Sequence, residues 1–307
     1  SGTSGLGILN LGGLQTVNVS GLGYTTAAGA VQGSVNFGIV HVGDVVAAQG
    51  VSVQNSAPVT ALNDTLAASI GGAAGAFNTN NGVVAGLTAG GAANTTALTV
   101  GLSTASAGIY TGTAFVGLNS QNPDMADLTL ASQTVALSGT VNNYANAIFD
   151  KVNGSGTLSR VGDQFILDFG TVFQNSGSLS SIIDVDNAVL GPADLLDGSL
   201  ALLDGNDFAS TLLRAGFSGV AAGGTSGDAL SFLFDSTALG SFQDAVSLSW
   251  FGNNASGYQD QSRTYTLLVR GNVVQQGNTV PEPGTLALLL IAAVGAALAR
   301  RRRIVVY

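Results

Sequence analysis

A repeat of 132 residues constrains the fold of this chain more than any other feature of the sequence. Phe37-Gly38-Ile39-Val40 matches Phe169-Gly170-Thr171-Val172 at that offset. The same offset pairs Asn55 with Asn187, Leu118 with Trp250, and Gly139 with Gly271. One offset maintained over this length indicates a tandem duplication of a single structural unit.

Within each repeat, apolar residues recur at every second position. Val135, Leu137 and Val141 alternate with small or polar residues. The same alternation runs through Phe165, Leu167 and Phe169, through Val246, Leu248 and Trp250, and through Ile183 and Val185, with Asp184 and Asp186 on the opposite, solvent face. A period of two predicts strands with one buried face and one wet face, because successive strand side chains point to opposite sides.

A partial copy precedes the two full repeats. Residues 15–21 (QTVNVSG) resemble residues 133–139 (QTVALSG), and each segment is followed by a Tyr-x-x-Ala sequence that begins at Tyr24 or Tyr144. We therefore expect four parts along the chain. These are the closing strand of a truncated preceding repeat at 1–23, a first β-sandwich repeat at 24–143, a second at 144–278 and a C-terminal segment at 279–307.

Two segments are ambiguous in this scheme. Leu195 to Leu203 fits either a helical turn or a strand with its loop. Gly71 to Ala93 is so rich in Gly and Ala that it fits either a long flexible loop or a plain strand pair. A β-solenoid is the rival architecture, but a period of 132 residues is far longer than a solenoid coil.

Repeats of this length with about seven short alternating strands resemble immunoglobulin-like β-sandwiches. They also resemble the choice-of-anchor D modules, which are related to the ASPM/SPD-2/Hydin group. Five short motifs carry this resemblance: Phe37-Gly38-x-Val40, Val51-x-Val53-x-Asn55, Leu98-x-Val100-x-Leu102, Gly108-x-Tyr110 and Leu137-x-Gly139-x-Val141. The second repeat departs from the pattern at Phe173-Gln174-Asn175. The resemblance implies scaffolding or surface modules and no particular activity.

Composition narrows the set of partners. Charged residues make up 9% of the 307 residues, and the chain has 18 acidic and 9 basic side chains. Four of those bases lie in the C-terminal segment, so the body is strongly acidic and nucleic acid is excluded as an expected partner. The chain has no cysteine, so its stability depends on hydrophobic cores and not on disulfides.

Catalytic constellations are scarce. The one histidine is His41, which lies at the end of a predicted strand and corresponds to Phe173 in the second repeat. A Ser-His-Asp triad would need it, but a histidine on a strand face is the simpler interpretation. A pair of aspartates for glycoside hydrolysis stays open, although no pair stands out. We expect no catalytic residue and no enzyme activity.

The densest polar cluster is acidic. Six aspartates fall between Asp184 and Asp207, and four of them are candidate calcium ligands: Asp184, Asp186, Asp204 and Asp207. Solvated strand faces and Asx turns explain the same residues without a metal. No cofactor is expected apart from this calcium hypothesis. Trp250 and Tyr258 could stack on a sugar ring, but Trp250 alternates with core positions.

The C-terminal segment has three elements in order. Val280-Pro281-Glu282-Pro283 precedes an uncharged stretch at 284–299, which Arg300, Arg301, Arg302 and Arg303 follow. Sixteen apolar residues span about 24 Å as a helix, slightly less than a bilayer core of about 30 Å, and the arginines lengthen the span by snorkelling. We predict one transmembrane helix at 284–299, with the arginines in the cytoplasm and the body outside it. An ordinary C-terminal anchor has the same properties.

The order of these elements resembles the PEP-CTERM sorting signal of Gram-negative bacteria. The resemblance implies export and recognition by an exosortase. It also implies cleavage near Pro281–Pro283, after transient residence in the inner membrane, and delivery to the cell surface or the exopolysaccharide matrix of a biofilm. We therefore expect an exported structural or adhesion protein. The alternatives are a calcium-dependent or polysaccharide-binding module and a polysaccharide-acting enzyme.

Overall fold

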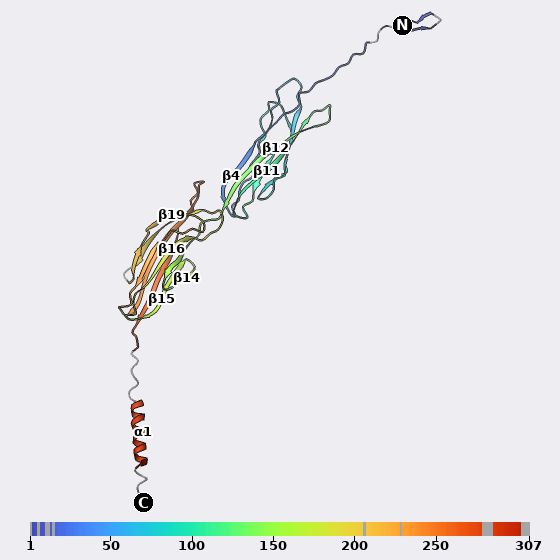
Figure 1. Ribbon diagram of the computed structural model, residues 1–307. Coiled ribbons are helices and arrows are strands. Elements are labelled where there is room, and N and C mark those ends of the chain that lie inside the picture. Colours follow the sequence, from blue (N-terminus) through green and yellow to red (C-terminus); the bar gives the residue numbers. More distant parts are fainter. Residues whose placement is uncertain are drawn as a thin grey trace. The chain divides into compact units, whose positions relative to one another are not determined.

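The computed structural model describes residues 2–4, 7–9, 13, 16–204, 207–227, 229–277 and 285–301. It contains two compact units, which are considered one at a time (Figure 1). Unit 1 comprises Ser1–Ala145 with the loop segments Val189–Asp194 and Asn253–Gln259. Unit 2 comprises Asn146–Ala188, Leu195–Gly252 and Asp260–Tyr307. Nearly all regular structure in both units is β-strand, as the period of two predicts.

Unit 1 is built around a five-stranded sheet in the order β4-β12-β11-β7-β9. Its strands are β4 (Ser34–His41), β12 (Leu128–Asn142), β11 (Gly108–Gln121), β7 (Thr65–Gly71) and β9 (Val83–Leu87). Two smaller sheets complete the unit, a three-stranded one in the order β5-β10-β8 and the pair β3-β6. Their strands are β5 (Gln49–Gly50), β10 (Thr99–Leu102), β8 (Phe77–Thr79), β3 (Gly29–Val31) and β6 (Val53–Asn55).

The core of unit 1 draws on all of these sheets. Val135, Leu137 and Val141 of β12 are at most 2% exposed, as their alternation predicts. They belong to one cluster with Val53 of β6 and Val100 of β10. Each fully buried aliphatic side chain contributes about 1.5–3 kcal/mol relative to an exposed one, so burial on alternate positions stabilises the unit.

Unit 2 has a six-stranded sheet in the order β14-β15-β22-β21-β17-β19 and a four-stranded sheet in the order β13-β16-β20-β18. The strands of the larger sheet are β14 (Thr157–Val161), β15 (Gln164–Phe173), β22 (Arg263–Val274), β21 (Gly240–Asn253), β17 (Leu195–Asp204) and β19 (Gly216–Val220). Those of the smaller sheet are β13 (Ala147–Gly154), β16 (Leu179–Asn187), β20 (Leu230–Phe234) and β18 (Ala209–Leu212).

Aromatic side chains dominate the core of unit 2. Trp250 is fully buried and packs against Tyr265, with ring centroids 5.4 Å apart, so its predicted place in the core is confirmed. Phe234 lies within 6 Å of Phe169 and Phe208, at centroid distances of 5.5 and 5.1 Å. Such tilted pairs add about 0.5–1.5 kcal/mol beyond the area they bury.

The two units share one framework, as expected of a tandem repeat. In each, a strand pairs in parallel with the last long strand, β4 with β12 and β15 with β22. Both pairings are interrupted at a glycine with positive φ, Gly38 at 71° and Gly170 at 72°. Asn36 Oδ1 accepts the Gly38 N–H at 2.9 Å, and Asp168 Oδ1 accepts the Gly170 N–H at 2.7 Å. The same side-chain cap therefore stabilises the same bulge in both repeats.

A buried asparagine is a second shared device. Asn55 Oδ1 accepts the Ala28 N–H at 3.1 Å, and Asn187 Oδ1 accepts the Asn146 N–H at 3.0 Å. The Nδ2 groups of both asparagines donate to backbone carbonyls at 3.1 Å. Since a buried amide must be hydrogen-bonded to avoid a large desolvation cost, the repeat preserves this residue for structural reasons.

Several boundaries differ from the sequence-based prediction. Residues 189–194 and 253–259 belong to unit 1, so the division into 24–143 and 144–278 does not describe the compact units. Apart from one short hairpin near the start of unit 1, the sheets of each unit contain ten strands among the described residues, β3 to β12 or β13 to β22, instead of about seven. The expected closing strand within 1–23 is absent from residues 16–23, because no neighbouring strand pairs with them in the described part of the chain. A short hairpin, β1 (Gly2–Ser4) with β2 (Gly7–Leu9), precedes them.

The structure also decides the two ambiguous segments. Leu195 to Leu203 lies within β17 and is not helical. Residues 71–93 contain β8 and β9, which join different sheets and so form neither a long loop nor a pair with each other.

The C-terminal segment contains one helix, α1 (Thr285–Arg301), close to the predicted 284–299 (Figure 1). No helix among the described residues is long and apolar enough to cross a membrane, so the structure does not support the predicted transmembrane span.

Gly38 and Gly170 should be sensitive to a side chain. Replacing either by alanine is expected to lower the free energy of unfolding by about 1–2 kcal/mol, because an L-residue is disfavoured at positive φ. No atom lies within 4 Å of the position that a Cβ would take at either site, so the cost is conformational and not steric. Urea denaturation followed by circular dichroism measures it. Gly21→Ala, in open space without a positive φ, is the matched control and should be neutral. Equal losses in all three variants would contradict the role of the bulge.

Candidate functional site

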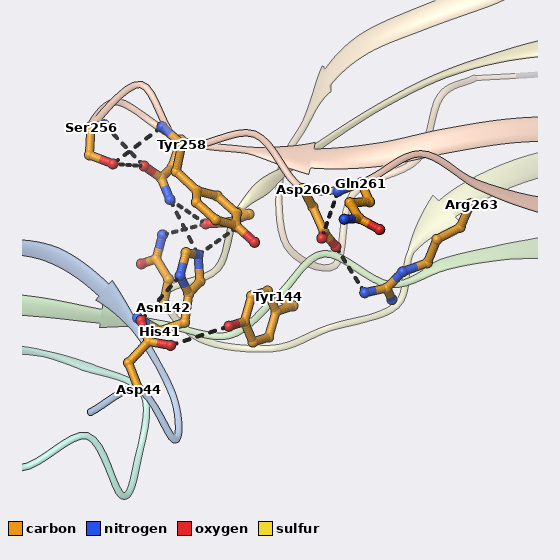
Figure 2. A network of polar contacts seen from close by, with 11 residues as sticks. His41, Asp44, Asn142, Tyr144, Ser256, Tyr258, Asp260, Gln261 and Arg263 are labelled. Atoms are coloured by element: carbon orange, nitrogen blue, oxygen red, sulfur yellow. Dashed lines mark hydrogen bonds and ion pairs between the residues drawn. The ribbon is translucent and has the colours of Figure 1, made fainter. Parts of the chain in front are cut away.

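The single histidine lies in a buried polar network within unit 1 (Figure 2). His41 ends β4, and its side chain is 5% exposed. Its Nε2 lies 2.7 Å from Oδ2 of Asp194, whose side chain is fully buried. Because a carboxylate only accepts hydrogen bonds, the imidazole carries a hydrogen on Nε2 in this contact.

Two asparagines bind the other oxygen of Asp194. Asn142, at the end of β12, donates from Nδ2 to Oδ1 at 3.0 Å, and Asn254 does so at 2.8 Å. The Asp194 N–H donates to the carbonyl of Asn143 at 3.0 Å. The buried carboxylate is thus satisfied by several donors, as a buried charge must be.

Asn143 positions the loop that carries Asp194. Its N–H donates to the Pro192 carbonyl at 2.9 Å, and its Nδ2 donates to the Leu190 carbonyl at 2.9 Å. These bonds attach residues 189–194 to the strand end after β12. The loop folds with unit 1 for this reason, although it lies far along the sequence.

Two tyrosines and a second carboxylate surround the imidazole. The Tyr144 ring stacks on His41 at 4.3 Å with an interplanar angle of 8°, and Tyr258 packs at 4.3 Å with a tilt of 51°. Asp44 Oδ2 accepts the His41 backbone N–H at 2.8 Å and lies 3.6 Å from Nδ1. The Tyr144 hydroxyl donates to Asp44 Oδ1 at 3.4 Å. Figure 2 shows Tyr144 and Asp44 joined beside His41.

This geometry is that of a structural contact. A Ser-His-Asp triad needs a hydroxyl hydrogen-bonded to the imidazole nitrogen opposite the aspartate. No serine or threonine hydroxyl makes such a bond to His41 among the described residues, and the opposite nitrogen, Nδ1, faces Asp44. His41 therefore connects the end of β4 to the loop segments 189–194 and 253–259, both from later in the sequence.

The first repeat contains a related aspartate. Asp64 precedes β7 as Asp194 precedes β17, and its N–H donates to the Thr25 carbonyl at 2.9 Å. Asn122 donates to Asp64 at 3.1 Å, as Asn254 donates to Asp194. Ser120 Oγ supplies a further bond at 2.7 Å. No sequence pattern predicts the role of these aspartates, although Asn122 and Asn254 stand at the repeat offset of 132 and could have indicated it.

Three of the four candidate calcium ligands, Asp184, Asp186 and Asp207, have described side chains. No group of three or more His, Cys, Asp or Glu side chains in the described part of the chain could hold a metal ion. Asp184 is buried, contrary to its predicted solvent face, because its oxygens accept the Ser226 hydroxyl at 2.5 Å and the Gly227 N–H at 3.1 Å. Asp207 Oδ2 accepts the Gln243 N–H at 3.0 Å. The side chain of Asp204 lies outside the described residues, and calcium binding stays a prediction.

Among the candidate calcium ligands, Asp186 has a shifted pKa. Burial raises the pKa of its carboxyl above the ordinary value, and the nearby charges of Asp184 and Asp150 raise it further. Asp150 is the cross-strand partner of Asp184 in the β13–β16 pair. Three carboxylates of β13 and β16 thus repel one another.

The predicted sorting residues fall mostly outside the described residues. These are Val280, Pro281, Glu282 and Pro283, together with Arg302 and Arg303. Arg300 is exposed near the end of α1, and Arg301 is the last residue of that helix.

The chain is thus an all-β protein of two sandwich units with a C-terminal helical segment. Its residues 279–303 match the PEP-CTERM protein-sorting motif. This motif implies export and sorting, and it is the recognition signal for exosortase processing. No curated protein matches the chain closely enough to count as a relative.

Three solved structures show a distant likeness to the chain. CfaE, the adhesive subunit of the CFA/I fimbria of enterotoxigenic Escherichia coli, is 8% identical, with 80% of this chain and 99% of that chain covered and a TM-score of 0.35. The Salmonella enterica SafA pilin with its SafB chaperone is 13% identical over 80% of this chain and 99% of that chain, at 0.25. A PapD-like domain of human CEP192 is 9% identical over 34% and 82%, also at 0.25. Scores this low carry no argument, and the sandwich architecture rests on the strand pairing described above.

Removing the carboxylate of Asp194 should destabilise unit 1. In Asp194→Ala, the donors on His41, Asn142 and Asn254 lose their acceptor, and leaving buried donors unsatisfied costs about 1–3 kcal/mol. We expect a loss of that size in urea denaturation followed by circular dichroism. The single tryptophan, Trp250, lies in unit 2, so its fluorescence should report a transition that shifts less. Asp163→Ala, at an exposed turn, is the control. A loss below about 1 kcal/mol, the size expected of an exposed pair, would show that the network contributes little.

Neutralising Asp186 should stabilise unit 2 at neutral pH. A raised pKa means that the folded chain holds this proton more tightly than the unfolded chain does. The free energy of unfolding therefore rises as pH falls through the raised pKa, and at pH 7 the ionised carboxylate lowers it. Asp186→Asn is expected to raise the melting temperature at pH 7. The gain in the free energy of unfolding should be at most about 1 kcal/mol, because solvent partly screens this group. The gain should shrink as pH approaches the ordinary aspartate value of 3.8. Asp163→Asn serves as control, and a gain independent of pH would refute the explanation.

Proposed function

We propose that this chain is an exported, non-enzymatic surface or matrix protein that an exosortase processes at its C-terminal segment. The match of residues 279–303 to the PEP-CTERM protein-sorting motif carries the proposal. In it, the apolar segment at 284–299 crosses the inner membrane transiently, with Arg300 to Arg303 on the cytoplasmic side. Cleavage near Pro281–Pro283 then releases the body toward the cell surface or an exopolysaccharide matrix.

The body suits such a role for physical reasons. Both units have extensive cores and no disulfide, so they need no oxidising partner to fold after export. The immunoglobulin-like modules, which resemble choice-of-anchor D modules, would act as rigid spacers. They would hold the outer part of the protein away from the membrane. The His41 network supports this because it stiffens a strand end and two loops without offering a reactive group.

The sorting segment can be tested directly. Replacing Pro281, Glu282 and Pro283 by alanine, in a host that has an exosortase, should leave full-length protein in the inner membrane, because the recognition signal is gone. Fractionation and the electrophoretic size of the protein measure this. Gln275→Ala/Gln276→Ala, at exposed positions just before the motif, is the matched control and should be processed normally. If the alanine variant reached the surface at the cleaved size, the sorting role would be wrong.

A further inference from the structure

An open groove lies on unit 2, and its lining includes the bulge residues Asp168 and Gly170 and the candidate calcium ligand Asp207. Its volume is about 610 Å³, within the range of roughly 300–1,000 Å³ typical of sites for small molecules. Its lining residues are Asp168, Gly170, Thr171, Asp207, Ser241, Phe242, Gln243, Arg270, Gly271 and Asn272. Most of these side chains are polar, so the groove suits a ligand that is rich in hydrogen-bonding groups.

A row of three charged and amide side chains forms the centre of the groove. Asp168, Arg270 and Gln243 are cross-strand partners on β15, β22 and β21, so they point to the same side of the sheet. The Arg270 guanidinium binds Asp168 Oδ2 through Nε at 2.9 Å and Nη2 at 2.8 Å. This two-point contact holds a planar array of donors in place.

A second row lies beside the first. Thr171, Asn272 and Ser241 are again cross-strand partners, and the Ser241 hydroxyl donates to Asn272 Oδ1 at 3.2 Å. Phe242 lies between Ser241 and Gln243 on β21, so its half-buried ring points to the opposite face of the sheet and packs edge-on against Phe234 at 5.8 Å and 66°. The groove face of these strands therefore presents hydroxyl, amide and charged groups.

The charges of the lining disfavour an anionic ligand. Two carboxylates and one guanidinium face the groove. The Gly170 N–H, and then Arg270, lower the pKa of Asp168, so this carboxylate stays ionised. Arg270 is already paired with it. The amide of Gln243 and the hydroxyl of Thr171 make no side-chain hydrogen bond to another described residue, and they remain for a ligand.

The fold does not require this polar row. In unit 1 the same framework positions, one repeat offset away, carry Asn36, Ser138 and Thr111 in place of Asp168, Arg270 and Gln243. The bulge cap is retained there, since Asn36 binds the Gly38 N–H as Asp168 binds that of Gly170. The corresponding sheet of unit 1 folds without these three groups. In unit 2 they are therefore not needed for folding and are available for binding at the surface.

We propose that this groove of unit 2 binds a neutral saccharide chain. The amides, the hydroxyls and the Asp168–Arg270 pair would exchange hydrogen bonds with the hydroxyl groups of the sugar. The proposal is independent of export and sorting, because it concerns the lining of one folded unit. Failure of saccharide binding would leave the processing of the C-terminal segment untouched, and the reverse also holds.

The repeat supplies the test variant. Asp168→Asn/Arg270→Ser/Gln243→Thr installs the residues of unit 1 in unit 2. Isothermal titration calorimetry of the full chain in detergent uses cellohexaose, maltohexaose and xylohexaose as neutral probes and an alginate hexamer as the anionic one. We expect at least one neutral probe to bind with a dissociation constant of about 10 μM to 1 mM, and the triple variant to bind at least about tenfold more weakly. The alginate hexamer should bind more weakly than that neutral probe.

Controls separate recognition from folding and from net charge. Lys151→Ser/Asp163→Asn makes the same changes in charge on unit 2 outside the groove and should bind as the unmodified chain does. If the triple variant loses its thermal transition, Gln243→Ala replaces it, because that exposed side chain has no structural partner among the described residues. Absence of binding by all three neutral probes, preference for alginate, or undiminished binding by the groove variant would each overturn the proposal.

Discussion

The fold depends on the burial of alternate side chains between paired sheets. Charged residues are only 9% of the chain and cysteine is absent, so neither ion pairs nor disulfides can replace the stability that this burial provides. The long strands β11, β12, β21 and β22 carry most of it, because their inward positions are filled by apolar residues while their outward positions face water. The strands of this framework position the bulge caps, the buried asparagines and the polar groove described above.

Buried polar groups then define the loops. Each repeat has one such aspartate, Asp64 or Asp194, at the end of a long loop and just before the next strand. Its carboxylate accepts hydrogen bonds from asparagine side chains at the ends of other strands. Such a residue costs desolvation energy and is tolerated because all its oxygens are satisfied. Its benefit is specificity of loop position. His41 adds a further donor to Asp194, and the aromatic rings of Tyr144 and Tyr258 shield that contact from water.

The repeats keep their interior and change their surface. Gly38 and Gly170 preserve one bulge, and Asn55 and Asn187 preserve one buried amide, because these positions satisfy the backbone. Outward positions are free of this requirement. On the matching face, unit 1 carries small neutral side chains where unit 2 carries Asp168 and Arg270. Duplication with surface divergence lets one exported scaffold present two different faces.

The sequence by itself determined the repeat, the strand faces and the C-terminal motif. These are local properties, since a period of two needs only neighbouring residues and the sorting motif is linear. It also placed Trp250 in the core correctly. Only the tertiary structure decided that Asp194 meets His41, that Asp184 is buried, and that residues 189–194 and 253–259 fold with unit 1. Those contacts join residues more than a hundred positions apart or depend on a loop covering a strand face. Loop hydrogen bonds obey no periodicity, so no pattern along the chain encodes them visibly.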